Sequence, residues 1–262
     1  MEIIDSHTHI YPDKIAEKAK EYLQQSFKRT MIDLPTKDNL FKYMEKAGVS
    51  KSVVASVASR PEQVLPINNW LFSNKDERII PFAAMHPFFE DYKEELKRIK
   101  DNARGIKIQS EFQLFYVDDE KAFPMYEELE KLGIPVLFHC GVELTSIGEV
   151  RSSPDRMLKV LEKFPGLKVI GAHMGGFLMW DEVLEKLAGK NIYFDTSDSI
   201  RFMKRETLKL YFEKHGYDKI FHASDFPLEN PKNEVDFIRS LDISEEDKEK
   251  IFSGNIKKLL EI

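Results

Sequence analysis

The stretch EIIDSHTHIYP (residues 2–12) joins a short apolar run to two histidines, His7 and His9, that stand two positions apart. On a β-strand, residues two apart point to the same side, so both imidazoles project in one direction, about 6–7 Å apart along the chain. Two ring nitrogens can converge on one ion from such positions. A pair of hydrogen-bonded core histidines is the alternative, and the rest of the chain has to decide between the two.

Seven more short apolar or β-branched runs follow, with amphipathic segments between them. In residues 118–132, for example, apolar side chains recur in steps of three, which indicates a helix that Gly133 ends. Eight strands separated by helices predict an α/β fold, a (β/α)8 TIM-type barrel, formed by residues 1–262 as a single domain. A doubly wound open sheet is the alternative. The predicted strands are residues 2–7, 51–57, 79–85, 104–108, 134–139, 168–173, 191–196 and 219–224.

The composition argues against several classes of protein. The 39 basic and 45 acidic residues are interleaved and give a net charge of -6, which does not suit a nucleic-acid-binding surface. No stretch approaches the roughly 20 apolar residues of a membrane-spanning helix, and the N-terminus lacks the pattern of a secretory signal. The lone Cys140 rules out an internal disulfide. These features predict a cytoplasmic protein that binds neither nucleic acid nor membranes.

Most of the histidines fall at the C-terminal ends of predicted strands, and Asp225 falls at the end of the eighth strand. In a (β/α)8 barrel these ends build the active site. Three imidazoles and one carboxylate make a zinc-type ligand set with room for water. The alternatives are a core role for His139, a supporting role for His173 and a helix N-cap at Asp225. The strand-end histidines are His7, His9, His86, His139 and His173.

Candidate substrate-binding residues follow the other strands. Arg60 has the chemistry to hold a carboxylate, or it is a surface arginine that opens a helix. His86 either lines the pocket or has a hydrogen-bonded structural role. Further candidates are Asp195, Thr196, Ser197, Arg151, Arg201 and Arg205 and, as an aromatic lid, Phe112, Phe115 and Tyr116.

Several longer motifs occur in order along nearly the whole chain. They are DSHTHIYP (5–12), RGIKI (104–108), LFHCG (137–141), VIGAHMGG (169–176), YFDTS (193–197), FHASDFP (221–227) and FSGNIKKLL (252–260). With these motifs the chain resembles the amidohydrolase superfamily, and within it the amidohydrolase-related branch that includes aminocarboxymuconate-semialdehyde decarboxylase.

The resemblance implies a barrel of the metallo-dependent hydrolase type with one divalent metal ion, typically Zn²⁺. Its ligands would be His7, His9, His139 and Asp225. The resemblance also implies catalytic roles for His173, beside the metal-bound water, and for Asp225, which would accept a proton from that water.

Three positions near the predicted strand ends need separate treatment. In some members of the superfamily a lysine on the fourth strand is carboxylated and bridges a second metal, but an unmodified Lys107 that lines the substrate site fits a ligand set with one carboxylate better. Gln109 stands where the branch often has histidine. His222 has the opposite strand parity to Asp225, so we expect it to face the helix layer in a structural role.

Three functions remain open from the sequence. We expect a metal-dependent hydrolase of a small organic amide, ester or lactone that uses a metal-activated water. A metal-dependent, non-oxidative decarboxylase of an aromatic or muconate-type acid is the alternative, and a non-catalytic binding or assembly barrel is the third. The predicted partner is a small-molecule substrate, with homo-oligomers left open.

Overall fold

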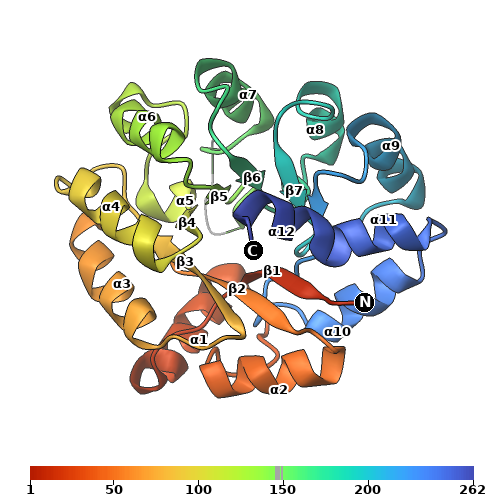
Figure 1. Cartoon of the computed structure of the whole chain (residues 1–262), viewed down its shortest axis with the longest axis horizontal. Coiled ribbons are helices and arrows are strands. Elements are labelled where there is room, and N and C mark those ends of the chain that lie inside the picture. Colours follow the sequence, from red (N-terminus) through yellow and green to blue (C-terminus); the bar gives the residue numbers. More distant parts are fainter. Residues whose placement is uncertain (145–147, 149) are drawn as a thin grey trace.

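The computed structural model describes residues 1–144, 148 and 150–262. Within these residues, eight parallel strands pair in the order β1 to β8, and helices surround them in a ring (Figure 1). The strands are β1 (Ile4–Thr8), β2 (Lys51–Ala55), β3 (Ile79–Ala84), β4 (Gly105–Ile108), β5 (Val136–Phe138), β6 (Val169–Gly171), β7 (Tyr193–Asp195) and β8 (Ile220–Phe221). Each predicted strand is confirmed, and most are shorter than predicted.

The α-helices alternate with the strands, except that two of them follow β1, two follow β4 and three follow β8. No helix in the described part of the chain is long and apolar enough to cross a membrane. The helices are α1 (Asp13–Phe27), α2 (Lys37–Ala47), α3 (Val64–Ser73), α4 (Tyr92–Asn102), α5 (Ser110–Gln113), α6 (Phe123–Leu132), α7 (Pro154–Lys163), α8 (Trp180–Lys186), α9 (Arg205–His215), α10 (Pro231–Arg239), α11 (Glu245–Glu249) and α12 (Asn255–Leu260), with 3₁₀ turns η1 (Pro61–Gln63) and η2 (Glu120–Ala122) and a π-helical segment η3 (Lys250–Gly254).

The barrel closes between its last and first strands. The backbone N–H of Ser6 donates to the carbonyl of His222 at 2.9 Å, and a parallel bridge joins Thr8 to Phe226. These bonds remove the free edges that an open sheet would have, so the doubly wound alternative is wrong.

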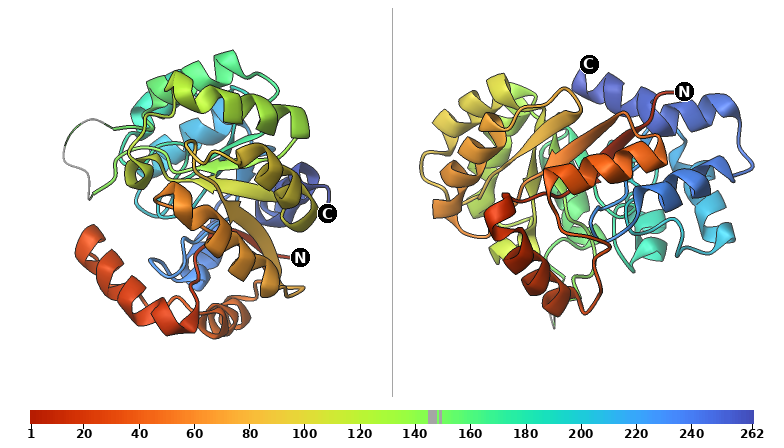
Figure 2. Two further views of the ribbon diagram at one scale, coloured as in Figure 1. Left: turned by 90° about the vertical axis from the view of Figure 1, so that its left-hand side faces the viewer. Right: turned by 90° about the horizontal axis from the view of Figure 1, so that it is seen from below.

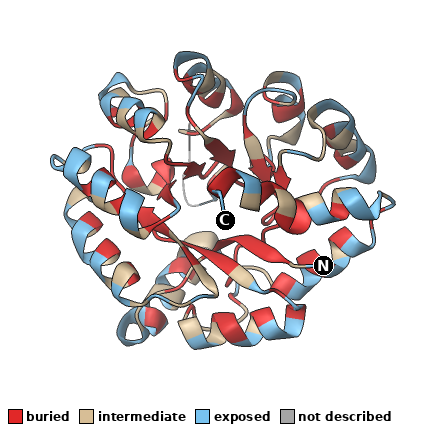
Figure 3. Cartoon of the chain, viewed as in Figure 1, coloured by how far each residue is buried: buried red, intermediate tan, exposed pale blue. Residues whose placement is uncertain are grey.

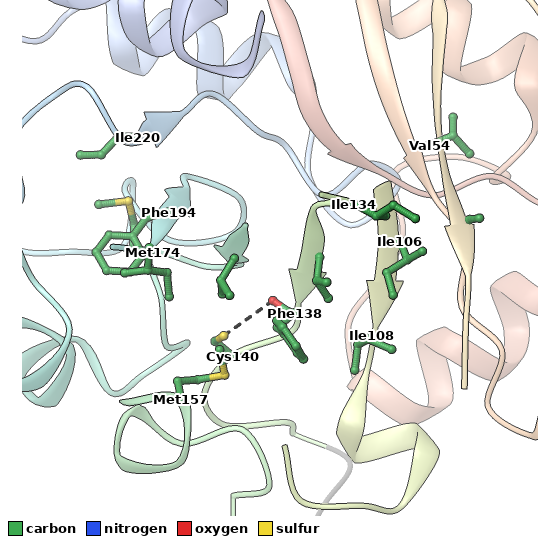
Figure 4. Close-up of a cluster of buried hydrophobic side chains, with 14 of the residues drawn as sticks. Val54, Ile106, Ile108, Ile134, Phe138, Cys140, Met157, Met174, Phe194 and Ile220 are labelled. Carbon is green, nitrogen blue, oxygen red and sulfur yellow. Dashed lines mark hydrogen bonds between the residues drawn. The ribbon is translucent and has the colours of Figure 1, made fainter. Parts of the chain in front are cut away.

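Two apolar clusters alternate along the strands. The larger one lies between strands and helices; Figure 4 shows Ile106, Ile108 and Phe138 in it. The smaller one includes Val53 and Phe82 and fills the barrel interior. Buried residues accordingly lie on the strands and on the inward faces of the helices (Figure 3).

Gly105 shows why β4 presents polar groups to the interior. A Cβ on Gly105 would lie 2.6 Å from the ring of Phe82, so Gly105 faces the interior beside that ring. Because strand side chains alternate, Lys107 and Gln109 point to the same side, successively nearer the C-terminal end. The strand therefore begins among apolar side chains at the bottom of the barrel and ends among polar side chains at its C-terminal end, which we call the mouth.

The C-terminal segment closes the bottom of the barrel. Figure 1 shows α12 and the C-terminus across the centre of the ring, and Ile256, Leu259 and Leu260 of α12 belong to the interior cluster. Ser244 caps α11 by accepting a hydrogen bond from the N–H of Asp247 at 3.0 Å. From α11 the chain continues through η3 into α12.

The helix α1 lies at the other end of the molecule. Figure 2 shows it at the end of the barrel opposite to the two chain termini. The ring of Phe27, its last residue, lies 6.0 Å from that of Phe112 in α5, and Arg29 just beyond it pairs with Asp198 and Glu229. The end of α1 thus contacts loops that follow β4, β7 and β8, above the barrel mouth.

Candidate functional site

Two histidines of β1 and an aspartate after β8 meet at the C-terminal end of the barrel. The ligand atoms of His7, His9 and Asp225 all lie within 4.8 Å of one another. The adjacency of β1 and β8 places them there: the N–H of Asp225 donates to the carbonyl of His7 at 2.9 Å, and Ser224 donates from Oγ to Asp5 at 2.6 Å.

A bulge in β1 aims His7 inward. Between Asp5 and Thr8 the pairing with β2 advances three residues on β1 against two on β2. Ile4 belongs to the interior cluster, and regular alternation would therefore turn His7 outward. The extra residue reverses the parity, a known use of bulges near active sites.

Hydrogen bonds fix the protonation of both imidazoles. His9 Nδ1 lies 2.7 Å from the carbonyl of Ala55, which only accepts, so Nδ1 carries the proton. His7 Nδ1 lies 2.9 Å from the Asp195 carboxylate and donates to it. Burial lowers the pKa of His7 to about 4, which keeps it neutral. Both residues therefore present an Nε2 lone pair to the cluster.

Asp225 supplies an anionic oxygen without a donor. Burial alone would raise the pKa of Asp225, yet that pKa lies well below the usual value, so the side chain is a carboxylate. Its Oδ1 makes no hydrogen bond with any described residue, and it lies 3.2 Å from His9 Nε2. A lone pair and a carboxylate oxygen at this distance repel unless a cation lies between them, so these residues fit a divalent metal ion.

Two further imidazoles, those of His173 and His139, form a hydrogen-bonded pair near this group. His173 Nδ1 lies 3.1 Å from the carbonyl of Ser197 and must donate, so His173 Nε2 accepts from His139 Nδ1, also at 3.1 Å. His139 Nε2 is left as a buried lone pair with no hydrogen-bond partner in the described part of the chain. The relay thus orients His139 as a ligand, although it stands outside the tight group of His7, His9 and Asp225.

The strand parity of β6 does not by itself bring His173 inward. Val169 lies in the outer cluster and Ile170 in the inner one, so an extended His173 would face the helices. His173 and Met174 instead adopt positive φ angles of 60° and 55°. This strained conformation turns the imidazole toward His139.

Lys107 lies directly against the cluster. Its Nζ is 3.2 Å from His7 Nε2, and its side chain is buried. Burial lowers the pKa of Lys107, while the carboxylates of Asp195 and Asp225 oppose that shift. The lysine is thus the polar group of β4 closest to the candidate ligands.

The other two predicted substrate-binding residues have local partners. The Arg60 side chain is 64% exposed and pairs with Glu62 at 2.6 Å. His86 is buried and its Nδ1 accepts from the N–H of Phe88 at 3.2 Å. Their roles in substrate binding stay predictions.

Several further candidates are engaged in local contacts. Arg151 pairs with Glu111 at 3.1 Å, and Arg201 pairs with Glu229 at 2.8 Å. His222 lies with its ring 5.5 Å from that of Phe252 in η3, which confirms that it faces the helix layer.

Sequence reasoning missed Glu143 and the pair of Arg29 with Asp198. Glu143 is buried on the loop after β5, with Oε2 3.9 Å from His139 Nε2. Its only signal is its place four residues after a strand-end histidine. Arg29 lies twenty positions after His9, beyond the inserted helix α1, where no local pattern indicates proximity to the site.

Two cavities lie elsewhere, at the bottom of the barrel. One, of about 290 Å³, is lined by Lys168, Tyr193 and Leu259, and the other, of about 350 Å³, by Lys51, Ile79 and Ile262. They border strand N-termini, and no histidine is among their lining residues.

Comparison with known proteins gives consistent matches. The model of the family described as Amidohydrolase matches residues 4–262. The gamma-resorcylate decarboxylase of Polaromonas sp. (strain JS666) is 25% identical over 56% of this chain and 56% of its own length, so the alignment spans little more than half of that relative.

Solved structures share the fold over the full chain. A 2,6-dihydroxybenzoate decarboxylase complexed with 2,6-dihydroxybenzoate has a TM-score of 0.76 and 19% identity, with all of both chains covered. A dihydroxybenzoic acid decarboxylase from Polaromonas sp. JS666, with bound manganese and the inhibitor 2-nitroresorcinol, has a TM-score of 0.74 and 19% identity over 99% of this chain and 97% of its own.

These comparisons correct the predicted reaction. The sequence favoured hydrolysis of an amide, ester or lactone, with decarboxylation as the alternative. That preference is wrong, because the similar proteins are decarboxylases.

Proposed function

We propose, from the premise that the chain belongs to the amidohydrolase family, that this enzyme is a metal-dependent, non-oxidative decarboxylase of an aromatic carboxylic acid. Family membership confirms the resemblance seen in the sequence motifs. The observation that carries the proposal is the convergence of Nε2 lone pairs on the donor-free Oδ1 of Asp225. The names of the similar decarboxylases support the reaction and the aromatic substrate.

We propose that His7, His9, His139 and Asp225 hold one divalent ion. Three imidazoles and one carboxylate form a set that zinc accepts, whereas a similar solved decarboxylase carries manganese, so both ions need to be tried. When bound, the ion supplies positive charge for the oxygens of the acid and for the negative charge that develops on the ring. An unmodified Lys107 leaves one carboxylate in the set, which suits a single ion.

The residues behind the ligands hold them in place. Asp195 accepts from His7, the Ala55 carbonyl accepts from His9, and His173 accepts from His139. Such contacts fix the tautomer and the ring orientation of each ligand. The site is therefore organised before substrate arrives, which limits the reorganisation that the reaction requires.

Asp225 is our candidate for the proton transfer. In decarboxylation the bond between the ring carbon and the carboxyl carbon breaks, carbon dioxide leaves, and a proton joins the ring carbon. The acid arrives as its carboxylate, so the proton that joins the ring carbon comes from the solvent: Asp225, ionised in the resting site, takes up this proton, passes it to that carbon and is left as a carboxylate again. Lys107 adds a cationic group that attracts the anionic substrate.

The test is a direct assay of product. Protein loaded with manganese or zinc is incubated with a panel of hydroxylated benzoic acids, and carbon dioxide and the phenolic product are measured together. We expect equal amounts of both, and their loss in Asp225→Asn but not in the surface variant Asp218→Asn. Failure to release carbon dioxide from any aromatic acid, with metal bound, would overturn the proposal.

A further inference from the structure

The turn that follows β6 is unusual because two residues with bulky side chains adopt left-handed backbone. His173 and Met174 have φ angles of 60° and 55°. Across them, the N–H of Gly175 donates to the carbonyl of Ala172 at 3.0 Å. A tight turn with positive φ at both central residues is normally built from glycine and asparagine, because a larger side chain clashes with the following carbonyl. Such strained backbone persists only where the surrounding contacts hold it, and it is concentrated at functional sites.

The end of β7 holds the two backbone donors of this turn. The N–H of His173 donates to Asp195 Oδ1 at 3.0 Å, and the N–H of Met174 donates to the carbonyl of Asp195 at 2.7 Å. Asp195 is the residue that also accepts from His7, so β7 links the turn to the candidate metal ligands. The carbonyl oxygens of His173 and Met174 have their side-chain partners on the helices instead.

Two side chains of the helix layer hold these carbonyl oxygens. Trp180, the first residue of α8, donates from its indole Nε1 to the carbonyl of His173 at 3.2 Å. The hydroxyl of Tyr211 in α9 lies 3.1 Å from the carbonyl of Met174 and 3.1 Å from that of Trp180. Carbonyl oxygens only accept, so the single hydroxyl hydrogen of Tyr211 is shared between the turn and the residue that also holds it. Tyr211 is 0% exposed, so bulk water does not replace this hydrogen bond.

We propose that Tyr211 is a positioning residue of the metal site, because its hydroxyl, together with the indole of Trp180, holds the left-handed turn that directs His173 toward His139. The inference rests on the proposed function, since it concerns how the proposed metal ligands are held. With regular strand geometry His173 would face the helices, and its Nε2 could not accept from His139 Nδ1. His139 would then lose the contact that orients its Nε2 toward the metal.

The first test measures metal affinity, so it does not depend on turnover. Tyr211→Phe removes only the hydroxyl, and competition with a chromogenic chelator gives the affinity for Zn²⁺. We expect binding about 10-fold weaker than in wild type, the lower end of the usual effect of a residue behind a ligand, because Tyr211 acts through His173. The matched control is Tyr126→Phe, which removes an equally buried hydroxyl that has no hydrogen-bond partner among the described residues and should change the affinity by less than about 2-fold. If Tyr211 were merely structural, the variant would lower the free energy of unfolding and leave the affinity unchanged.

The second test needs no metal. In metal-free protein with isotope-labelled histidine, nuclear magnetic resonance in mildly alkaline buffer distinguishes a proton on Nδ1 from one on Nε2, and the signals of His173 are identified by their absence in His173→Gln. We expect the proton on Nδ1 alone in wild type and in Tyr126→Phe, because His173 Nδ1 donates to the carbonyl of Ser197. A mixture of the two forms is expected in Tyr211→Phe. If Tyr211→Phe does not fold, Trp180→Phe, which removes the other donor to the turn, decides between the same outcomes.

The possible outcomes distinguish this inference from the proposed function. Unchanged metal affinity in folded Tyr211→Phe overturns the inference, whether or not the signals of His173 change, and so does an equal loss of affinity in Tyr126→Phe. If carbon dioxide is released from an aromatic acid while Tyr211→Phe keeps the wild-type affinity, only the inference fails. If Tyr211→Phe weakens metal binding and alters His173 but no aromatic acid loses carbon dioxide, only the proposed reaction fails.

Discussion

The two ends of the barrel are buried to a similar degree, but apolar side chains fill the bottom and polar side chains fill the mouth. At the bottom, Ile256 and Leu259 of α12 pack against the interior cluster, and neither is more than 5% exposed. At the mouth, His7, Lys107 and Asp195 are at most 2% exposed. Removing apolar carbon from water stabilises a fold, whereas burying imidazole, ammonium and carboxylate groups destabilises it unless each finds a partner.

The difference assigns the two ends to different tasks. The bottom holds the barrel together, and its side chains need only the right volume. At the mouth many polar groups have a specific contact, and the buried atoms without a partner in the described part of the chain include Asp225 Oδ1 and His139 Nε2, which a cation would use. Substitutions at the mouth should therefore change metal binding and catalysis, and substitutions at the bottom should change stability.

The largest effect is expected from removing two ligands. In His7→Ala/His9→Ala we expect loss of bound metal and a fall in decarboxylation of about 1,000-fold or more, since a bound ion contributes several kcal/mol to transition-state stabilisation. Plasma mass spectrometry measures the metal. Added metal should raise the melting temperature of wild type and not that of the variant. Full metal content in the variant would place the ion elsewhere.

A substitution at the bottom should do the reverse. Leu259→Ala empties part of the interior cluster and should lower the free energy of unfolding by about 3 kcal/mol. Urea denaturation measures this, and kcat/KM below the transition should stay within about 2-fold of wild type. Leu114→Ala, at a leucine 73% exposed near the mouth, is the control and should change stability by less than about 0.5 kcal/mol. A large loss of activity in Leu259→Ala would break the division between the two ends.

Much of this difference between the apolar bottom and the polar mouth of the barrel could be predicted from the sequence. The eight strands have local signatures, and the alternation of strand side chains is enough to turn His139 inward. Asp225 lies beyond the end of β8 with a positive φ of 65°, so alternation alone does not determine its direction. The motif around His7 and His9 indicated the end of β1 that carries two of the candidate metal ligands. The fold therefore followed from local patterns together with the general rule that parallel strands present their C-terminal ends on one face.

The rest depended on tertiary context. The bulge between Asp5 and Thr8 and the left-handed backbone of His173 each reverse a strand parity, and neither leaves a mark in composition. Glu143 and Arg29 reach the mouth through loop and insertion geometry that the surrounding chain determines. The reaction was also beyond the sequence pattern, because the same ligand set serves hydrolysis and decarboxylation.

A smaller effect is expected from a residue that orients a candidate metal ligand than from the ligands themselves. Asp195→Asn removes the charge that accepts the proton of His7 Nδ1 and should weaken metal affinity about 10- to 100-fold without abolishing binding. Competition with a chromogenic chelator measures it, with Asp218→Asn, a surface carboxylate paired with Lys250, as the control. Unchanged affinity would mean that Asp195 has no role in orienting His7.

The smallest effect is expected at His222 and concerns the pH dependence of stability. This buried polar residue lies between the barrel and the helices and belongs to neither end of the barrel. Both of its ring nitrogens lack hydrogen-bond partners among the described residues, and burial lowers its pKa to about 3. In the unfolded chain this histidine has an ordinary pKa near 6.5 and binds a proton below that pH, whereas in the folded chain it stays neutral. The free energy of unfolding is therefore highest above about pH 6.5 and falls as the pH drops toward 3.

His222→Leu should remove this dependence. Between pH 7.5 and pH 5.5 wild type should lose about 1 kcal/mol more of its free energy of unfolding than the variant, because one pH unit below 6.5 is worth about 1.4 kcal/mol per proton. Urea denaturation at the two pH values measures the difference, and the other histidines cancel because both proteins contain them. Equal losses would mean that His222 takes up its proton in the folded protein, and hence that water or a partner reaches the layer between β8 and η3.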